Sequence, residues 1–215
     1  AFSFNISAQE CEAYIPTQQG KKYTYVMKNK KGKIQSYYSQ ELLKKKNEEG
    51  GIKFEILHIS YDQKKEITNT DTLEFLCKGD VFYIDMTRYL NEEQMNAYED
   101  AEITVTYDNL GYPLGLQPGT QLEDGYVQAV INAGMPITFR TEIVNRKVES
   151  YENIDTEAGT FKTLKISEEL VSKMGFVNMN MKSVIWIKTD IGNVKSETYD
   201  KRGNLVSYAE LISIE

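Results

Sequence analysis

Few side chains in this chain have the type and spacing to do chemistry, and a single histidine limits what they could do. A Ser–His–Asp triad or a Cys–His nucleophile pair would have to use His58, which lies in an apolar alternating segment. Asp80 with Asp85 could act as a general acid and base, and so could Glu123 with Asp124. With 32 acidic residues, however, such pairs arise by chance. The sequence has no Gly-x-Ser-x-Gly motif and no second histidine for a metal cluster. It therefore predicts a protein that is not an enzyme and has no cofactor or metal site.

Aromatic side chains are the second group that could have a function, namely binding. The chain has fifteen tyrosines against eight phenylalanines and one tryptophan. Tyrosine combines high β propensity with an apolar body and a polar tip, so it suits the wet face of a sheet. It also suits a binding surface for sugar, peptide or lipid. Four residues are candidate walls of a ligand cavity: Phe139, Trp186, Tyr199 and Tyr208. The alternative is that each of them fills the core.

The two cysteines, Cys11 and Cys77, leave two alternatives open. They could be buried free thiols of a cytosolic protein or one disulfide in an oxidising compartment. The flanks favour the disulfide, because Cys11 precedes a near-terminal segment that needs tying down. A bridge would close a loop of about 66 residues and would contribute roughly 4 kcal/mol in the chain-entropy model, less any native strain.

Length and charge restrict the classes further. The chain has 215 residues and a net charge of −7, which disfavours a nucleic-acid partner because phosphate binding depends on clustered Lys and Arg. No apolar run approaches the roughly 18 residues of a membrane-spanning helix. The sequence begins at Ala1 rather than Met, so we expect that a leader was removed from an exported protein.

Short β-rich runs separated by turn sequences must position these residues. Residues 23–27 and 34–38 flank a turn at 29–32 and predict a hairpin. Residues 52–60 alternate, with His58 continuing the apolar side, where a histidine is usually a hydrogen-bonded core or rim residue. A meander fills the last third of the chain, cut by turns at 190–193 and 200–203.

Other segments are irregular. Along residues 137–148, the longest alternating run, the apolar side switches at Val144 and Val148, which predicts a bulge or bend. Residues 41–49 suit either a helical turn or a strand. Asn91 can cap a helix over residues 91–101, because two glutamates follow it in the first turn.

About eleven strands and scarce helix signals predict a mostly β protein. Its antiparallel sheet would curl into a half-barrel or form a sandwich, with one or two short helices. We expect a single β-rich domain over residues 1–215, with two halves at 1–101 and 102–215 as the alternative.

The order of several short motifs resembles the TapB-like family, uncharacterised exported proteins of Gram-negative bacteria. The motifs are Cys11, residues 14–16, Gly20 and residues 77–86, 116–125, 145–149, 156–161 and 191–199. The resemblance implies a signal peptide or lipoprotein leader, a periplasmic or outer-membrane-associated location and a Cys11–Cys77 disulfide. It also implies a β-rich fold similar to the curled sheets of lipoprotein carriers, but no biochemical activity.

These observations favour a non-catalytic binding or carrier module for a small apolar or sugar ligand. A curled sheet can hold such a ligand in its concavity. The alternative is a structural or assembly component of the cell envelope that acts through an envelope protein partner, for which edge strands are suited.

Overall fold

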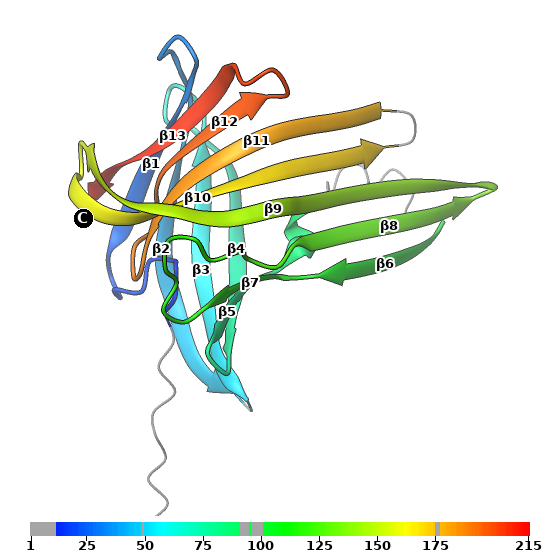
Figure 1. Ribbon diagram of the computed structural model, residues 1–215, viewed down its shortest axis with the longest axis horizontal. Coiled ribbons are helices and arrows are strands. Elements are labelled where there is room, and N and C mark those ends of the chain that lie inside the picture. The colour runs from blue at the N-terminus through cyan, green and yellow to red at the C-terminus, as the bar shows by residue number, and fades with distance from the viewer. Residues whose placement is uncertain (1–11, 49, 91–94, 96–100, 175–176) are drawn as a thin grey trace, which may run out of the picture.

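A computed structural model describes residues 12–48, 50–90, 95, 101–174 and 177–215. Thirteen strands form one antiparallel sheet (Figure 1). The strands are β1 Lys22–Asn29, β2 Ile34–Glu48, β3 Gly51–Tyr61, β4 Ile67–Lys78, β5 Val81–Ile84, β6 Glu102–Asp108, β7 Leu110–Pro113, β8 Gly125–Ala133, β9 Met135–Thr156, β10 Gly159–Met174, β11 Val177–Lys188, β12 Gly192–Asp200 and β13 Leu205–Ile214. A 3-10 helix, η1, covers Met86–Tyr89.

The sheet curls almost into a closed barrel. Its order is β6-β8-β9-β10-β11-β12-β13-β1-β2-β3-β4-β5-β7, so the last strand of the chain pairs with the first. In Figure 1, β1 to β4 run up the page whereas β6, β8 and β9 run across it, which shows the strong twist. The β7 end of the sheet comes back into contact with β8. The predicted antiparallel β fold is confirmed; the barrel is fuller than a half-barrel, and one continuous sheet rules out a sandwich.

Turn chemistry explains the first hairpin, which the sequence predicted. Tyr25 of β1 lies opposite Tyr38 of β2. The side-chain Oδ1 of Asn29 accepts hydrogen bonds from the backbone N–H groups of Lys31 and Lys33, at 2.9 and 3.1 Å. Gly32 supplies the positive φ of 75° that the turn requires.

The predicted bulge in the longest alternating run is also confirmed. The register between β9 and β10 shifts twice, between Lys165 and Ile166 and between Ser167 and Glu169. On the β9 side, Asn145 adopts a positive φ of 55°. The bulges let β9 bend strongly without losing its pairing with β10.

Two further segments of the chain are strands, which confirms the strand alternative for residues 41–48. Residues 41–48, left open between helical turn and strand, continue strand β2. Residues 167–174 continue strand β10 to Met174, and from Val177 the chain forms β11. Cross-strand pairing supplies their backbone hydrogen bonds, and pairing partners distant in sequence are not visible in a local pattern. The predicted helix at 91–101 lies outside the described residues except for Met95 and Ala101.

The apolar core fills one end of the inner face of the curled sheet. The rings of Phe75 and Phe82 stack there, 5.7 Å apart, beside the buried Phe54 and Ile56. The segment before β1 closes this end, because the backbone N–H of Asp190 donates to the carbonyl of Ala13 at 2.9 Å.

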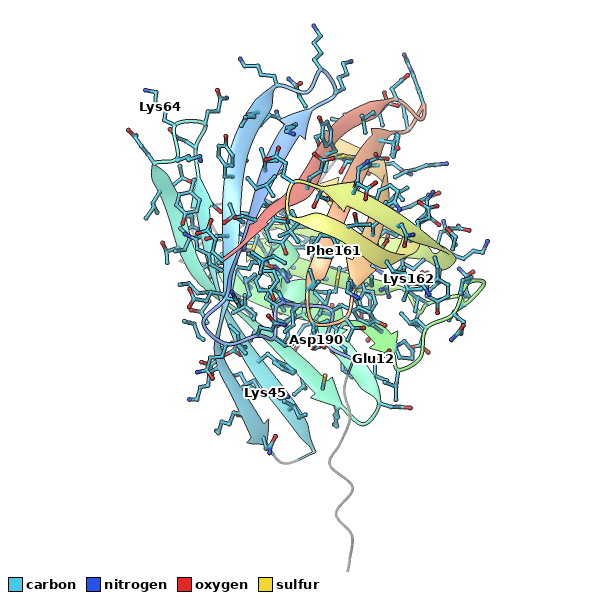
Figure 2. All side chains as sticks on the ribbon, turned by 90° about the vertical axis from the view of Figure 1, so that its left-hand side faces the viewer. Glu12, Lys45, Lys64, Phe161, Lys162 and Asp190 are labelled. Carbon is cyan, nitrogen blue, oxygen red and sulfur yellow. The ribbon has the colours of Figure 1, made fainter. Side chains whose placement is uncertain are left out.

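Figure 2 shows Glu12 near Asp190, which belongs to the β11–β12 turn. The Glu12 carboxylate accepts a hydrogen bond from the backbone N–H of Gly115 at 2.9 Å. The described part of the N-terminal segment is therefore tied both to this turn and to the loop after β7.

Candidate functional site

A row of rings crosses the inner face on the first three strands. The rings of Tyr25 and Tyr38 stack 4.5 Å apart, with an interplanar angle of 9°. The ring of Tyr38 in turn stacks on the imidazole of His58, at 5.3 Å and 25°. Strand register brings the three residues to one face, because Tyr38 lies opposite Tyr25 on one side and opposite Ser60 on the other. The row leads from the packed interior to His58.

Hydrogen bonds fix the ring of His58 on both of its nitrogens. Nδ1 lies 3.5 Å from Nε2 of Gln40, and Nε2 lies 3.3 Å from the hydroxyl of Ser60. Burial lowers the pKa of His58, and the nearby Arg88 lowers it further, whereas Asp71 has the opposite effect. The imidazole is therefore neutral at pH 7, with one nitrogen as donor and the other as acceptor.

Helix η1 brings an arginine against this face. The carboxylate of Asp85 caps the helix by accepting a hydrogen bond from the backbone N–H of Thr87 at 2.8 Å. The buried Met86 anchors it, and its N–H donates to Oδ1 of Asn109 at 3.0 Å. The guanidinium of Arg88 then lies over the ring of Phe75, 5.4 Å from its centroid.

Between η1 and the strands β3 and β4 lies a pocket of about 830 Å³, which we call the inner pocket. Its lining includes His58, Ser60, Asn69, Asp71, Asp85 and Arg88, with Leu73 and Leu90 as apolar members. Carboxylates, an amide, a hydroxyl, a neutral imidazole and a guanidinium face one space. Such a mixture of donors and acceptors suits a ligand with several hydroxyl groups.

His58 and Ser60 form part of a hydrolytic triad, but the third member is not in place. The nitrogen of His58 that would face an orienting carboxylate lies beside Gln40. Asp71 lies opposite His58 in the β3–β4 register, yet its Oδ1 accepts a hydrogen bond from the backbone N–H of Thr72 at 2.7 Å. The arrangement of His58 and Ser60 suits hydrogen bonding to a ligand better than activation of Ser60 as a nucleophile.

A second polar cluster surrounds the fully buried Arg146, where the two ends of the sheet meet. The Nη1 of Arg146 on β9 donates to the carbonyls of Glu123 at 2.6 Å and of Gly111, on β7, at 3.4 Å. The guanidinium lies 4.6 Å from the ring centroid of Tyr112 and forms an ion pair with Glu168 on β10, with Nε and Oε2 3.6 Å apart. This cluster joins β9 and β10 to β7, so its position indicates a structural role.

The predicted wall residues divide between the two faces of the sheet. Trp186, Tyr199 and Tyr208 lie on one face of β11 to β13, as the strand registers show. Phe139, opposite Met174 in the β9–β10 pair, lies on the other face. The structure therefore places three of the four on one face, and their role in ligand binding stays a prediction.

Trp186 is enclosed by charged groups and is only 5% exposed. Its Nε1 donates to the Glu152 carboxylate at 2.7 Å, and the ammonium groups of Lys165 and Lys195 lie 5.4 and 5.2 Å from its ring centroid. Tyr199 donates to the Glu197 carboxylate, and this bond, followed by burial, raises the pKa of Tyr199 to about 12. Since the indole is covered, Trp186 offers a ligand little open ring surface.

Sequence reasoning noted His58 but did not find Arg88, Asp71 or Asp85 as its companions. The alternation of residues 52–60 was the available signal, since it places His58 on the same side as the core. Its companions come from β4 and η1, and only the strand register and the docking of η1 bring them near.

Neither cysteine pairing nor export is tested by this geometry. Cys77 is completely buried, and the described residues include no free cysteine. Cys11 lies outside the described residues, so the Cys11–Cys77 disulfide stays a prediction. Within the described ranges, we find no cluster of three or more His, Cys, Asp or Glu side chains fit for a metal ion. None of their helices has the length and apolar character needed to cross a bilayer.

Two solved structures share this fold. One is an inferred exported protein with a YmcC-like fold from Bacteroides fragilis, with a TM-score of 0.74 and 19% identity over 95% of this chain and 100% of that chain. The other is an inferred lipoprotein from Parabacteroides distasonis, with a TM-score of 0.76 and 20% identity over 96% of this chain and 100% of that chain. At such identities the likeness establishes the fold alone.

The sequence comparisons identify the family but no activity. None of the curated proteins matches the chain. The TapB-like name suggested by the motifs stays a prediction. The model of the DUF3108-like family matches residues 18–211, nearly the whole chain, so the protein belongs to the DUF3108-like family.

Proposed function

We propose that this protein is an exported, envelope-associated binding module that holds a small sugar-type ligand in the inner pocket without transforming it. The observation that carries the proposal is the polar lining of the inner pocket, about 830 Å³ in volume, around the neutral, fixed imidazole of His58. A cavity of this size falls within the range of small-molecule sites.

The chemistry of the lining favours a sugar over the apolar ligand that the sequence left open. The carboxylates of Asp71 and Asp85 can accept hydrogen bonds from hydroxyl groups, and Arg88 can donate. An apolar ligand would remove water from these groups without replacing its hydrogen bonds, which is unfavourable.

The contacts of His58 support binding rather than catalysis. General-base catalysis by Ser60 and His58 would need an acceptor to orient and stabilise the charged imidazole. Gln40 occupies that position, and burial and Arg88 both oppose the charged form.

The related solved structures support the envelope location. The related structures from Bacteroides fragilis and Parabacteroides distasonis are described as an inferred exported protein and an inferred lipoprotein. Each is covered over its whole length by this fold. A Cys11–Cys77 disulfide, which we propose as well, would fit an oxidising compartment.

Native mass spectrometry of protein purified from its own host tests the binding proposal. We expect an extra mass that leaves on denaturation and that is strongly reduced in the Arg88→Gln variant. Arg202→Gln, an exposed arginine in the β12–β13 turn, is the matched control and should retain the mass. A wild-type protein without bound mass, or a mass that Arg88→Gln retains in full, would contradict the proposal.

An assembly role is the second candidate, and the end strand β6 favours it. This strand is the last of the sheet, and its Val105 and Tyr107 are 40% and 52% exposed. An end strand of this kind can pair with a strand of a partner protein. The same mass spectra would favour this role if they showed a bound protein subunit in place of a small ligand. The Val105→Lys variant should then lose that subunit.

A further inference from the structure

A second hollow lies on the outer face of the sheet and has a composition unlike that of the inner pocket. Tyr37 of β2 lies directly opposite Tyr61 of β3, and both are on the face opposite to Tyr38. Lys22 of β1 and Lys65 of the β3–β4 turn complete the set. Together these four residues line a groove of about 250 Å³, which we call the outer groove.

Each lysine in the outer groove lies beside one of the tyrosine rings. The ammonium of Lys22 is 5.5 Å from the ring centroid of Tyr61 and donates to its hydroxyl at 3.2 Å. The ammonium of Lys65 is 5.2 Å from the ring centroid of Tyr37. The hydroxyl of Tyr61 is also 3.3 Å from that of Ser39, which holds the ring in place. The aromatic rings thus orient both cations at the groove.

These two cations are available to a ligand. In the described part of the chain, neither Lys22 nor Lys65 forms a salt bridge. Glu215 is the acidic residue in the lining, beside Thr24, Ile212 and Ser213. With two lysines and one glutamate, the lining has a local excess of positive charge on a protein whose net charge is −7.

Lys65 adopts an unfavourable backbone conformation. Its φ is +66°, a value that costs a non-glycine residue about 1 kcal/mol. The carboxylate of Asp62 stabilises the turn by accepting hydrogen bonds from the N–H groups of Lys64 and Glu66, at 2.8 and 2.9 Å. A strained lysine at the rim of a groove is consistent with a functional constraint.

We propose that the outer groove binds an anionic sugar ring, with its carboxylate between Lys22 and Lys65 and its C–H face on the tyrosine rings. A volume of 250 Å³ is smaller than that of sites for drug-sized ligands and suits a single ring. Charge-assisted hydrogen bonds would select the anion, and the half-buried rings would select the apolar face of the sugar. The groove lies on the face opposite to His58, so this site is independent of the inner pocket.

Titration with D-glucuronate, observed through backbone amide NMR shifts, tests the site. We expect saturable shifts that cluster at residues 22–24, 37 and 61–65. Lys22→Gln and Lys65→Gln should each weaken binding about three- to tenfold, as loss of a charge-assisted contact does. The double variant should abolish it.

Three controls separate the proposal from simple charge attraction. Lys64→Gln removes a neighbouring lysine of the same turn (Figure 2) that does not line the groove, and it should bind like the wild type. D-glucose lacks the anion, and inorganic phosphate lacks the sugar ring. Each should therefore bind at least tenfold more weakly than D-glucuronate. The proposal is overturned if glucuronate causes no saturable shift, if phosphate binds equally well, or if Lys64→Gln weakens binding as much as Lys22→Gln.

Discussion

Two glutamates of this protein show how local surroundings decide the behaviour of one residue type. Glu168 is largely buried, with its side chain 12% exposed, and this burial raises the carboxyl pKa above the ordinary 4.5, although Arg146 beside it acts in the opposite direction. Glu152 accepts a hydrogen bond from the indole of Trp186, and this contact lowers its carboxyl pKa. The two carboxyls should therefore contribute to stability with opposite dependence on pH.

Replacing Glu168 by glutamine should reveal this dependence. The folded state binds the Glu168 proton more tightly than the unfolded state does, because the pKa is raised on folding. As the pH rises from about 4.5 through the folded pKa, the wild-type free energy of unfolding should fall relative to that of Glu168→Gln. Urea denaturation at a series of pH values measures the difference.

Glu152→Gln is the matched comparison with the opposite sign. The lowered pKa means that the stabilising effect of Glu152 is present above 4.5 and is lost as the pH falls through the folded pKa. The wild type should therefore lose its stability advantage over Glu152→Gln on acidification.

For Glu168, the contradicting outcome is that the free energies of unfolding of wild type and Glu168→Gln change in parallel with pH. The burial of Glu168 would then have no effect on the pH dependence of stability.

At the scale of elements, the contacts of Arg146 hold the two ends of the sheet together. This residue follows the positive-φ Asn145 in the bulged part of β9, and its side chain reaches the carbonyl of Gly111 in β7. Its Nε and Nη2 and the Oε2 of Glu168 lack a hydrogen-bond partner among the described residues. Removing one partner of a buried ion pair leaves an uncompensated charge in the interior, which is strongly destabilising.

Arg146→Met should lower the free energy of unfolding by about 3 kcal/mol or more, because it leaves the Glu168 carboxyl buried without its partner. Arg140→Met is the control on the same strand. Its side chain is 30% exposed and its guanidinium pairs with Glu142, so we expect a loss of about 1 kcal/mol or less. Chemical denaturation at pH 8 compares the two variants.

The double variant Arg146→Met/Glu168→Met adds a second readout. It removes both charges, so it should recover much of the stability lost in Arg146→Met. Equal losses in Arg146→Met and Arg140→Met would contradict a closing role for the buried pair.

At the scale of the whole molecule, the sheet depends on pairings between strands far apart in sequence. β1 pairs with β13, and β5 pairs with β7. A single domain over residues 1–215 remains our expectation, and one cooperative transition in the denaturation experiments would be its check.

A Cys11–Cys77 bridge would add one more long-range constraint, and its effect is measurable. Cys11→Ala should lower the free energy of unfolding by up to about 4 kcal/mol under non-reducing conditions, because the bridge closes a long loop. Adding a thiol reductant should make wild type and variant equally stable. Two free thiols in the denatured, non-reduced wild type would exclude the bridge.

By itself, the sequence determined the local structure of this protein. Alternation at residues 52–60 identified β3 and placed His58 on the side of the buried Phe54 and Ile56. Turn residues marked the β1–β2 hairpin and both turns of the last meander, and the switch at Val144 marked the bulge of β9. These features depend on backbone sterics and on a two-residue period, which a short segment already contains.

Only the tertiary structure decided how far the sheet curls and which side chains share a space. Sheet closure depends on strand twist and on contacts such as that of Arg146 with β7, which join residues far apart in the chain. The inner pocket exists because η1 docks Arg88 opposite His58, and the outer groove exists because register places Tyr37 beside Tyr61. Register and docking are set by packing of the whole molecule, so local sequence patterns do not contain them.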